Sequence, residues 1–338
     1  MKTLQELVLP VLVLLLFAEL AMSLVSDAQW TQYKAQYMKR YRREIDDKYH
    51  RALFSNSVQA VAHNNRLYSQ GRVGFRMRLN QFSDVDPSQL SKFRTSVPPP
   101  PESGTRIVTK PPGYKSYNQI TGGIDWRKFG LVSEVGDQGT QCFSCWAFST
   151  TGVLEAHLAK KNKRMVPLSP KHLVDCVPLP SLGCLGGWVG LAFNYTRDNG
   201  IATKASYPYK PEKDDCNWNS KNSAGTLRGY VTLDKDDEKE LAEVVYNIGP
   251  VTASIDHLHD EFNQYSGGVL RIPACRSDKG NLYHSVLIVG FGTDPKWGEY
   301  WLIKNSYGTT WGENGFFRLA RNANNMCGVA TYVQYPLL

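Results

Sequence analysis

Two cysteines three residues apart are the side chains best suited to chemistry in this sequence. Cys142 and Cys145 lie in the stretch QGTQCFSCWAFS, and the chain holds seven cysteines, an odd number. If the others pair, one thiol is left over. A thiolate is a strong nucleophile, and the first turn of a helix stabilises it through unpaired N–H groups and the helix dipole. The apolar spacing of CWAFSTTGVLEAHLAKK predicts that Cys145 begins a helix, with Ser144 as its N-cap.

A thiolate nucleophile also needs a base and a group that orients the base. Two downstream residues could fill these roles: His284 in NLYHSVLIVGFG and Asn305 in YWLIKNSYGTTWGENGFF. Each stands where an apolar, β-rich run begins or ends.

The pair CFSC could instead be half of a zinc site or a redox dithiol. Zinc would need a second cysteine pair or histidines at close spacing, and these are absent from the sequence. A thioredoxin-like role would need a βαβ setting that this stretch lacks. We therefore expect no metal and no cofactor.

The elements that must position these residues fall into four segments. Residues 1–23 have the order of a secretory signal peptide, a basic start followed by an apolar stretch and small residues. Residues 24–96 predict two amphipathic helices and a short strand. Residues 97–119 combine proline runs with Gly and Ser and are typical of an extended linker that proteases can reach. Residues 120–338 predict a helix-rich half followed by a strand-rich half.

Charge is unevenly distributed along the chain. Residues 24–119 hold 16 Lys and Arg against 7 Asp and Glu, whereas residues 120–338 hold 22 of each. A nucleic-acid binder would concentrate basic charge on its working domain, so we expect no nucleic acid as partner. After the first residues, no stretch approaches a membrane span. The alternative for residues 1–23 is an uncleaved anchor.

The segment from about residue 120 onward resembles the papain-like cysteine peptidases, with the cathepsin L group as the nearest match. The motifs that carry the resemblance are SCWAFS, LSPKHLVDC, GCLGG, HSVLIVGFG and KNSYGTTWGENGFFRL, in the family's order. The resemblance implies an α+β, papain-like two-domain fold: a helical left half, a β-barrel-like right half and an active-site cleft between them. A helical prodomain would precede this fold.

Carried over by position, Cys145 matches the family's nucleophile, His284 its proton-sharing imidazole and Asn305 the amide that fixes the ring. Gln138 matches the oxyanion-hole side chain. The implied reaction is attack on a peptide carbonyl, formation of an acyl-enzyme on Cys145, and hydrolysis. The chain would then be a cysteine endopeptidase.

Further residues take their expected roles from the same resemblance. Three disulfides are implied, which leave Cys145 free: Cys142 with Cys184, Cys176 with Cys216, and Cys275 with Cys327. Substrate-binding positions are Gly186, Gly187, Trp188, Val189, Ser254, Leu282, Tyr283, Trp311 and Tyr332. Of these, Tyr332 falls at the floor of the pocket for the P2 side chain and would shorten it, which favours medium aliphatic residues there. Separately, the sequon at Asn194 predicts glycosylation.

The N-terminal third resembles the inhibitory prodomains of this family. The pattern along its long helix keeps Phe54 and Asn65, and the later signature keeps Asn80, Phe82 and Asp84 in RLNQFSD. The resemblance implies a zymogen that is cut within or just after the linker. Mild acid should release the mature form by weakening carboxylate contacts to the basic prodomain.

The chain departs from the family beside the nucleophile. Gln141 is an extra residue in that loop, and Phe143 replaces a usual glycine, which puts the oxyanion hole in question. Tyr307 stands where the family has a tryptophan. These departures motivate a second hypothesis, a catalytically impaired homologue that binds peptides or another protease. A third is a thiol protein that is not a protease.

The expected destination is the secretory pathway, with the lysosome or the extracellular space as end points. The expected partners are protein and peptide substrates, the chain's own prodomain as an intramolecular inhibitor, and cystatin-like inhibitors. We expect a monomer.

Overall fold

A single mixed sheet joins the N-terminal segment to the C-terminal half of the chain. The computed structural model describes residues 25–86, 104–233 and 236–338, so the expected signal peptide of residues 1–23 and the first part of the linker lie outside the described residues. No helix in the described ranges is long and apolar enough to cross a membrane.

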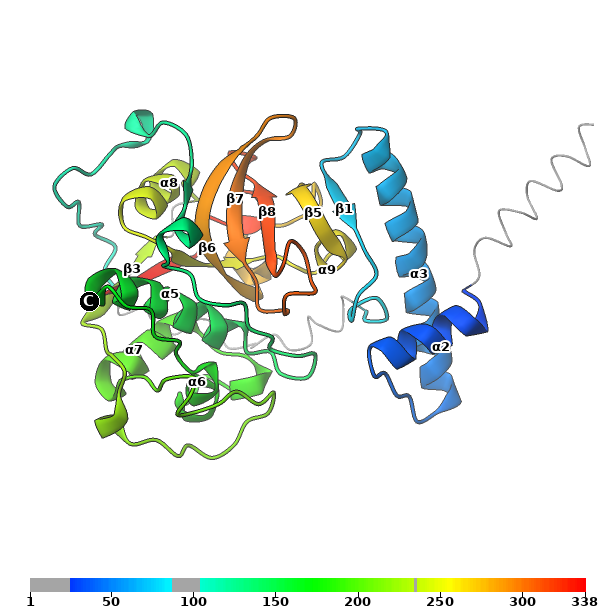
Figure 1. Cartoon of the computed structure of the whole chain (residues 1–338), viewed down its shortest axis with the longest axis horizontal. Helices are drawn as coiled ribbons and strands as arrows, with labels where there is room; N and C mark the ends of the chain where they lie inside the picture. Colours follow the sequence, from blue (N-terminus) through cyan, green and yellow to red (C-terminus); the bar gives the residue numbers. More distant parts are fainter. Residues whose placement is uncertain (1–24, 87–103, 234–235) are drawn as a thin grey trace, which may run out of the picture.

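Helices build most of the N-terminal segment and the lower half seen in Figure 1. The α-helices are α2 (Asp27–Gln36), α3 (Glu44–Ser69), α5 (Cys145–Asn162), α6 (Pro170–Cys176), α7 (Val189–Asn199), α8 (Glu238–Asn247) and α9 (Asp260–Asn263). The 3-10 turns are η2 (Tyr117–Gln119), η3 (Trp126–Phe129), η4 (Gly183–Leu185), η5 (Ser220–Asn222), η6 (Lys279–Asn281) and η7 (Met326–Gly328).

The sheet runs in the order β1-β5-β8-β7-β6-β4-β9-β3, with β2 paired to β6. Its strands are β1 (Phe75–Met77), β2 (Ile124–Asp125), β3 (Gly229–Leu233), β4 (Val251–Ile255), β5 (Tyr265–Leu270), β6 (His284–Asp294), β7 (Gly298–Lys304), β8 (Phe316–Ala320) and β9 (Val333–Leu337). The strand pairs are antiparallel except β5 with β8, which is parallel.

Helix α5 lies where the helical half meets the sheet. The Ser149 hydroxyl donates to the carbonyl of Val286 in β6 at 2.8 Å. A Cβ on Gly152 would come within 3.0 Å of the Leu287 side chain, so the helix and the strand pack closely at this point. The first residue of α5 and the first residue of β6 are Cys145 and His284, and this packing holds both ends in one region.

The predicted elements agree with the structure in type, and one detail differs. Ser144 is the N-cap residue of α5, but its side chain makes no capping hydrogen bond. Its hydroxyl lies 2.7 Å from the Tyr209 hydroxyl instead. Tertiary contact therefore replaces local capping at this helix start.

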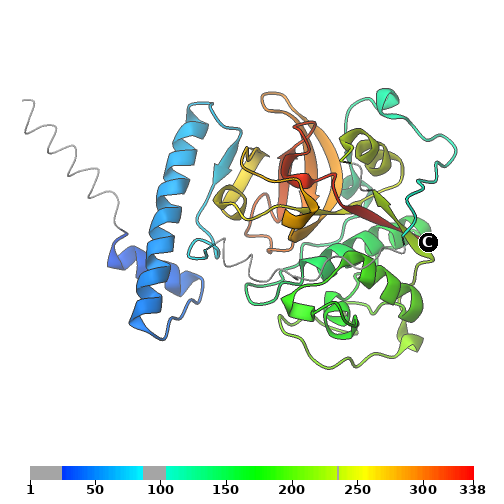
Figure 2. The same cartoon turned by 180° about the vertical axis from the view of Figure 1, so that it is seen from behind.

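The N-terminal segment adds an edge strand to the sheet. Helix α3 and strand β1 lie beside β5 at the far side of the strand-rich half, and the reverse view shows the same arrangement (Figures 1 and 2). β1 pairs antiparallel with β5. Asn65 of α3 clamps β1 from its other side, since its amide donates to the Met77 carbonyl and accepts from the Met77 N–H, both at 2.9 Å.

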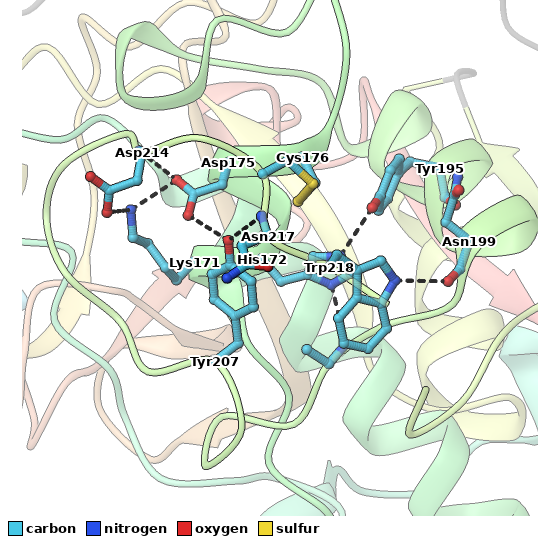
Figure 3. The surroundings of a disulfide bond; sticks show 12 residues. Lys171, His172, Asp175, Cys176, Tyr195, Asn199, Tyr207, Asp214, Asn217 and Trp218 are labelled. Carbon is cyan, nitrogen blue, oxygen red and sulfur yellow. Dashed lines mark hydrogen bonds and ion pairs between the residues drawn. A yellow bond between two sulfur atoms is a disulfide. The ribbon is translucent and has the colours of Figure 1, made fainter. Parts of the chain in front are cut away.

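A disulfide and a buried ion pair tie together the helical half (Figure 3). Beside Cys176, the Lys171 ammonium donates to Asp175 at 2.8 Å and to Asp214 at 2.7 Å, while the Lys171 side chain is almost fully buried. His172 accepts the Ala202 N–H on Nδ1, so Nε2 carries the proton and donates to the Tyr195 hydroxyl. Burial lowers the pKa of His172 to about 4, which supports a structural role for this neutral ring.

Candidate active site

Cys145 is the one cysteine of the described residues without a disulfide partner. The other six form Cys142–Cys184, Cys176–Cys216 and Cys275–Cys327, the pairs that the resemblance implies. Burial is the main influence on the Cys145 thiol and raises its pKa. Backbone N–H groups of Ser285, Trp146 and Cys145 itself oppose this rise. Because Ser285 follows His284 directly, the sulfur lies against the backbone at the start of β6.

His284 and Asn305 meet through a hydrogen bond. Nε2 of His284 lies 2.7 Å from Oδ1 of Asn305, which also accepts the Ser306 N–H at 2.8 Å. Since Oδ1 is an acceptor, Nε2 carries the proton, and Nδ1 is the ring nitrogen left to exchange a proton with a thiol. Burial lowers the pKa of His284 to about 4, while the bond to Asn305 acts in the opposite direction. Burial thus favours neutral Cys145 and neutral His284 in this structure.

Tyr307 covers the histidine from one side. Its ring stacks on His284 with centroids 4.9 Å apart, and its side chain is 5% exposed. The prodomain residue Phe82 packs on the same tyrosine, at 4.6 Å between centroids. The tyrosine therefore shields His284 from water although it is smaller than the tryptophan that the resemblance would place here.

Gln138 is held by hydrogen bonds of both its side chain and its backbone. Its side-chain Oε1 accepts the Ser306 hydroxyl at 2.7 Å, and its Nε2 donates to the Cys142 carbonyl at 3.3 Å. Its backbone N–H donates to the Ser306 carbonyl at 2.9 Å. These bonds join the loop before Cys145 to the residue that follows Asn305, so the two sides of the site hold each other in place.

The irregular loop before Cys145 is accommodated without backbone strain. Gln141 is exposed. Phe143 donates its N–H to the Cys184 carbonyl at 2.8 Å and is not among the described residues with a left-handed backbone. A side chain at position 143 therefore meets no conformational penalty here, and nothing in this loop favours an impaired site.

The expected substrate-binding residues come from both halves of the chain. Gly187 packs against the Trp146 ring, which a Cβ would approach to 2.5 Å. On the sheet side, Ser254 donates its N–H to the Tyr332 carbonyl at 3.1 Å, and Leu282 lies against Gly328, where a Cβ would come within 2.5 Å of its side chain.

Gly186 has a φ of 122°. Trp188 is the N-cap residue of α7, and Val189 is buried as the first residue of that helix. Tyr283 donates its backbone N–H to the Ile255 carbonyl and its hydroxyl to the Gly280 carbonyl. Trp311 is 1% exposed and donates to the Asn263 carbonyl at 3.0 Å. Asn194 is half-buried on α7.

A cavity of about 240 Å³ opens behind Asn305, between α5 and the sheet. Buried Glu155 and Lys304 line it and are linked through the Ser133 hydroxyl. Burial raises the pKa of Glu155 and lowers that of Lys304. Each charged group therefore stabilises the charged form of the other. Through Ser133 they connect the helical half to β7.

One group of possible metal ligands lies elsewhere in the described part of the chain, formed by Asp256, His259 and Cys275 within 4.8 Å of one another. The Cys275 sulfur is in a disulfide, so it offers no thiolate. The Asp256 carboxylate is already bound by Arg276 and His259, each at 3.1 Å. This cluster is an ion-pair network.

Sequence reasoning missed three neighbours of the site. Ser306 and Tyr209 hold Gln138 and its backbone, the latter through a hydroxyl 3.0 Å from the Gln138 carbonyl. His257 lies beside His284, with ring centroids 4.9 Å apart. None of the three carries a spacing signal, because each meets the site only through folding.

This chain is similar to known proteins over most of its length. The profile of a family described as papain family cysteine protease matches residues 120–337, and that of the cathepsin propeptide inhibitor domain matches residues 30–90. Cathepsin L of Sarcophaga peregrina is 39% identical over 324 residues, 91% of this chain and 92% of that protein. A cathepsin L-like protein of Caenorhabditis elegans is 40% identical over 316 residues, 92% of this chain and 91% of that protein. Among solved structures, digestive procathepsin L 3 of Tenebrio molitor larval midgut is 38% identical with a TM-score of 0.79, covering 92% of this chain and 98% of that one.

Proposed function

Because this chain belongs to the papain family of cysteine proteases and is a cathepsin L-like zymogen with its own propeptide inhibitor domain, we propose that Cys145 is its nucleophile. His284 is the proton-sharing base and Asn305 orients it. The single observation that carries this assignment is the free Cys145 thiol placed against the backbone beside a histidine already fixed by an amide.

The reaction follows from these positions. Transfer of the thiol proton from Cys145 to Nδ1 of His284 gives a thiolate and an imidazolium. The thiolate attacks the peptide carbonyl, His284 returns the proton to the leaving amine, and the acyl group stays on Cys145 as a thioester. Water, deprotonated by His284, then releases the acid and restores the thiol.

The developing oxyanion would be stabilised by Gln138 and the backbone N–H of Cys145 at the start of α5. Nε2 of Gln138 has two hydrogens, of which one is directed to the Cys142 carbonyl. The second hydrogen is the donor that we assign to the oxyanion. A donor held by Ser306 before substrate arrives costs little reorganisation during the reaction.

The prodomain inhibits the enzyme of which it is part. Its described contacts with the peptidase half include the β1–β5 pairing and hydrogen bonds to backbone carbonyls. Arg78 donates to Thr310 at 2.6 Å, Asn80 to Asn263 at 2.7 Å, and Gln81 to Tyr307 at 3.3 Å. The last bond holds the prodomain at the tyrosine that covers His284.

Activation would remove residues 24–96 by cleavage in or just after the linker at 97–119. The described part of that linker supports this, since most of residues 106–119 are exposed, which suits a protease-accessible segment. We also propose a secretory-pathway destination in the lysosome or outside the cell, internal cleavage of protein and peptide substrates, cystatin-like inhibitors as partners, and glycosylation at Asn194.

The proposed P2 pocket is formed by Trp188, Val189, Ser254, Leu282 and Tyr332. The Lys279 ammonium lies 5.9 Å from the centroid of the Tyr332 ring. A phenol at the floor of the pocket would favour medium aliphatic P2 residues over large aromatic ones.

An experiment on protein freed of its prodomain tests the function. The wild type and Cys145→Ser are both cut in the linker by an added protease, which is then removed. Internally quenched peptides with different P2 residues are digested by each protein, and the products are identified by mass spectrometry. With the wild type we expect internal cuts at the bond that follows P1 in peptides with an aliphatic P2 residue, and with the variant no cuts. Removal of single or paired residues from peptide ends, or equal cleavage by the variant, would contradict the proposal.

A further inference from the structure

A second histidine lies against the one that we assign to the reaction. The ring centroids of His257 and His284 are 4.9 Å apart, with 36° between their planes. The antiparallel pairing of β4 with β6 places Ile255 opposite His284, and His257 follows two residues later. Phe262 of α9 meets both rings edge-on, at 6.2 Å and 5.8 Å. The two imidazoles therefore share one pocket of aromatic rings.

His257 is buried without a hydrogen bond to Nδ1. Its side chain is 7% exposed, and Nδ1 lies out of contact with water and with any donor or acceptor of the described residues. A structural histidine in this chain looks different: both nitrogens of His172 are bonded. A buried polar atom without a partner costs free energy, so its retention next to a reacting group suggests a role there.

The charges around His257 compensate a proton on it only in part. Asp256 precedes it, but that carboxylate is bound by His259 and Arg276. The His257 ring faces His284 of β6. Around His284 lie Cys145 of α5, Asn305 and the Tyr307 phenol. On its own loop His257 meets His259, which also interacts with Asp260 of α9. Burial lowers the pKa of His257 most, the His284 charge lowers it further, and Asp256 opposes both.

We propose that His257 is a positioning residue for His284 and sets the acid limit of the enzyme's activity. Its neutral ring packs against the imidazolium of the working ion pair. When the pH falls, a proton on His257 places a second positive charge beside that imidazolium, and the ion pair with the Cys145 thiolate is lost. This inference rests on the proposed roles of Cys145 and His284.

The acid limb of the pH profile is the readout. His257→Phe keeps a ring without a titrating group, and His257→Gln keeps a polar group of similar reach. In the activated enzyme, kcat/KM and the rate of Cys145 alkylation by iodoacetamide are followed between about pH 3 and pH 7. We expect both variants to keep plateau rates within about threefold of wild type and to move the acid limb down by about one pH unit, as repulsion between two cations at this distance requires.

His157→Gln is the matched control, because His157 is also buried but bonds the Pro250 carbonyl away from the site. Its acid limb should coincide with that of the wild type. Acid limbs that coincide in all four proteins, or a lower plateau without a shift of the limb, would overturn the role of His257.

A second measurement needs no variant. In the wild-type enzyme with isotope-labelled histidine, the His257 resonances should titrate together with the acid limb, and titration well apart from it would overturn the inference. Failure of the proposed function looks different: the wild type itself would then show no pH-dependent alkylation at Cys145.

Discussion

Nε2 of His284 lies 2.7 Å from the Asn305 side-chain oxygen, and the Tyr307 ring stacks on the same imidazole. The bond fixes the tautomer, and the stacked phenol limits the rotation of the ring. Asn305 is itself held by the Ser306 N–H. The orientation of the imidazole is therefore settled in the precursor, before any substrate binds.

Asn305→Ala should lower kcat/KM by about 10²-fold, because the imidazole loses the group that orients it toward the sulfur and small misplacements of reacting groups have effects of this size. The activity of the processed variant on a dipeptidyl fluorogenic substrate checks this. An unchanged kcat/KM would mean that Tyr307 and the pocket alone hold the ring.

Gln138→Ala should lower kcat by about 10²–10³-fold, the usual effect of removing one oxyanion donor. Gln141→Ala is the matched control from the same loop, since its side chain is exposed, and it should retain the wild-type rate. Equal rates for the two variants would show that Gln138 does not act on the oxyanion.

The main motifs of the site could be predicted from the sequence, because Cys145, His284 and Asn305 each occur in a local motif at an element boundary. The helix that begins at Cys145 follows from apolar spacing alone. The contacts of Gln138 with Ser306 could not be predicted, since they join segments more than 160 residues apart. The role proposed for His257 could not be predicted for the same reason: its neighbour in space, His284, is 27 positions away in the sequence.

The sequence predicted acid-sensitive carboxylate contacts to the basic prodomain but not where the carboxylates lie. Ion pairs of the described prodomain residues connect its own elements: Lys34 with Asp47, Lys39 with Asp84, and Arg51 with Asp27. From the linker, Lys110 pairs with Glu243 of the peptidase half at 3.8 Å. The number of charges in each segment does not show which residues form ion pairs with one another.

Asp84→Asn should destabilise the prodomain and raise the pH at which the precursor converts. The Asp84 side chain is fully buried and accepts from Lys39 at 2.8 Å and Tyr33 at 2.9 Å. Its loss leaves Lys39 without a counter-charge, which typically costs about 3 kcal/mol when a buried pair is broken.

Asp27→Asn is the control for this change, because the Asp27 carboxylate is 91% exposed in its pair with Arg51 and exposed pairs contribute little. Gel analysis of conversion against pH, in both variants and the wild type, distinguishes the two. If the conversion midpoint of Asp84→Asn stays at the wild-type pH, the buried cluster does not control activation.

Protonation of Asp47 should also lower the stability of the prodomain in acid. Burial alone would raise the Asp47 pKa, but hydrogen bonds from Lys34 and Trp30 outweigh it and the pKa is lowered. A lowered carboxyl pKa gives stability that is present above the unfolded value of about 3.9 and is lost as the pH falls through the folded value. Thermal unfolding of the Cys145→Ser precursor should therefore show a steeper loss below about pH 4 than the Asp47→Asn version of the same protein. Parallel curves would contradict this.

Labelling with an epoxide that alkylates active-site thiols tests the central claim most directly. After acid processing, we predict one label per chain, located by peptide mapping on Cys145, with the other six cysteines still in their three disulfides and with labelling strongly slowed in His284→Ala. Cys145 found in a disulfide, or an enzyme that still turns over substrate after Cys145→Ser, would contradict the account.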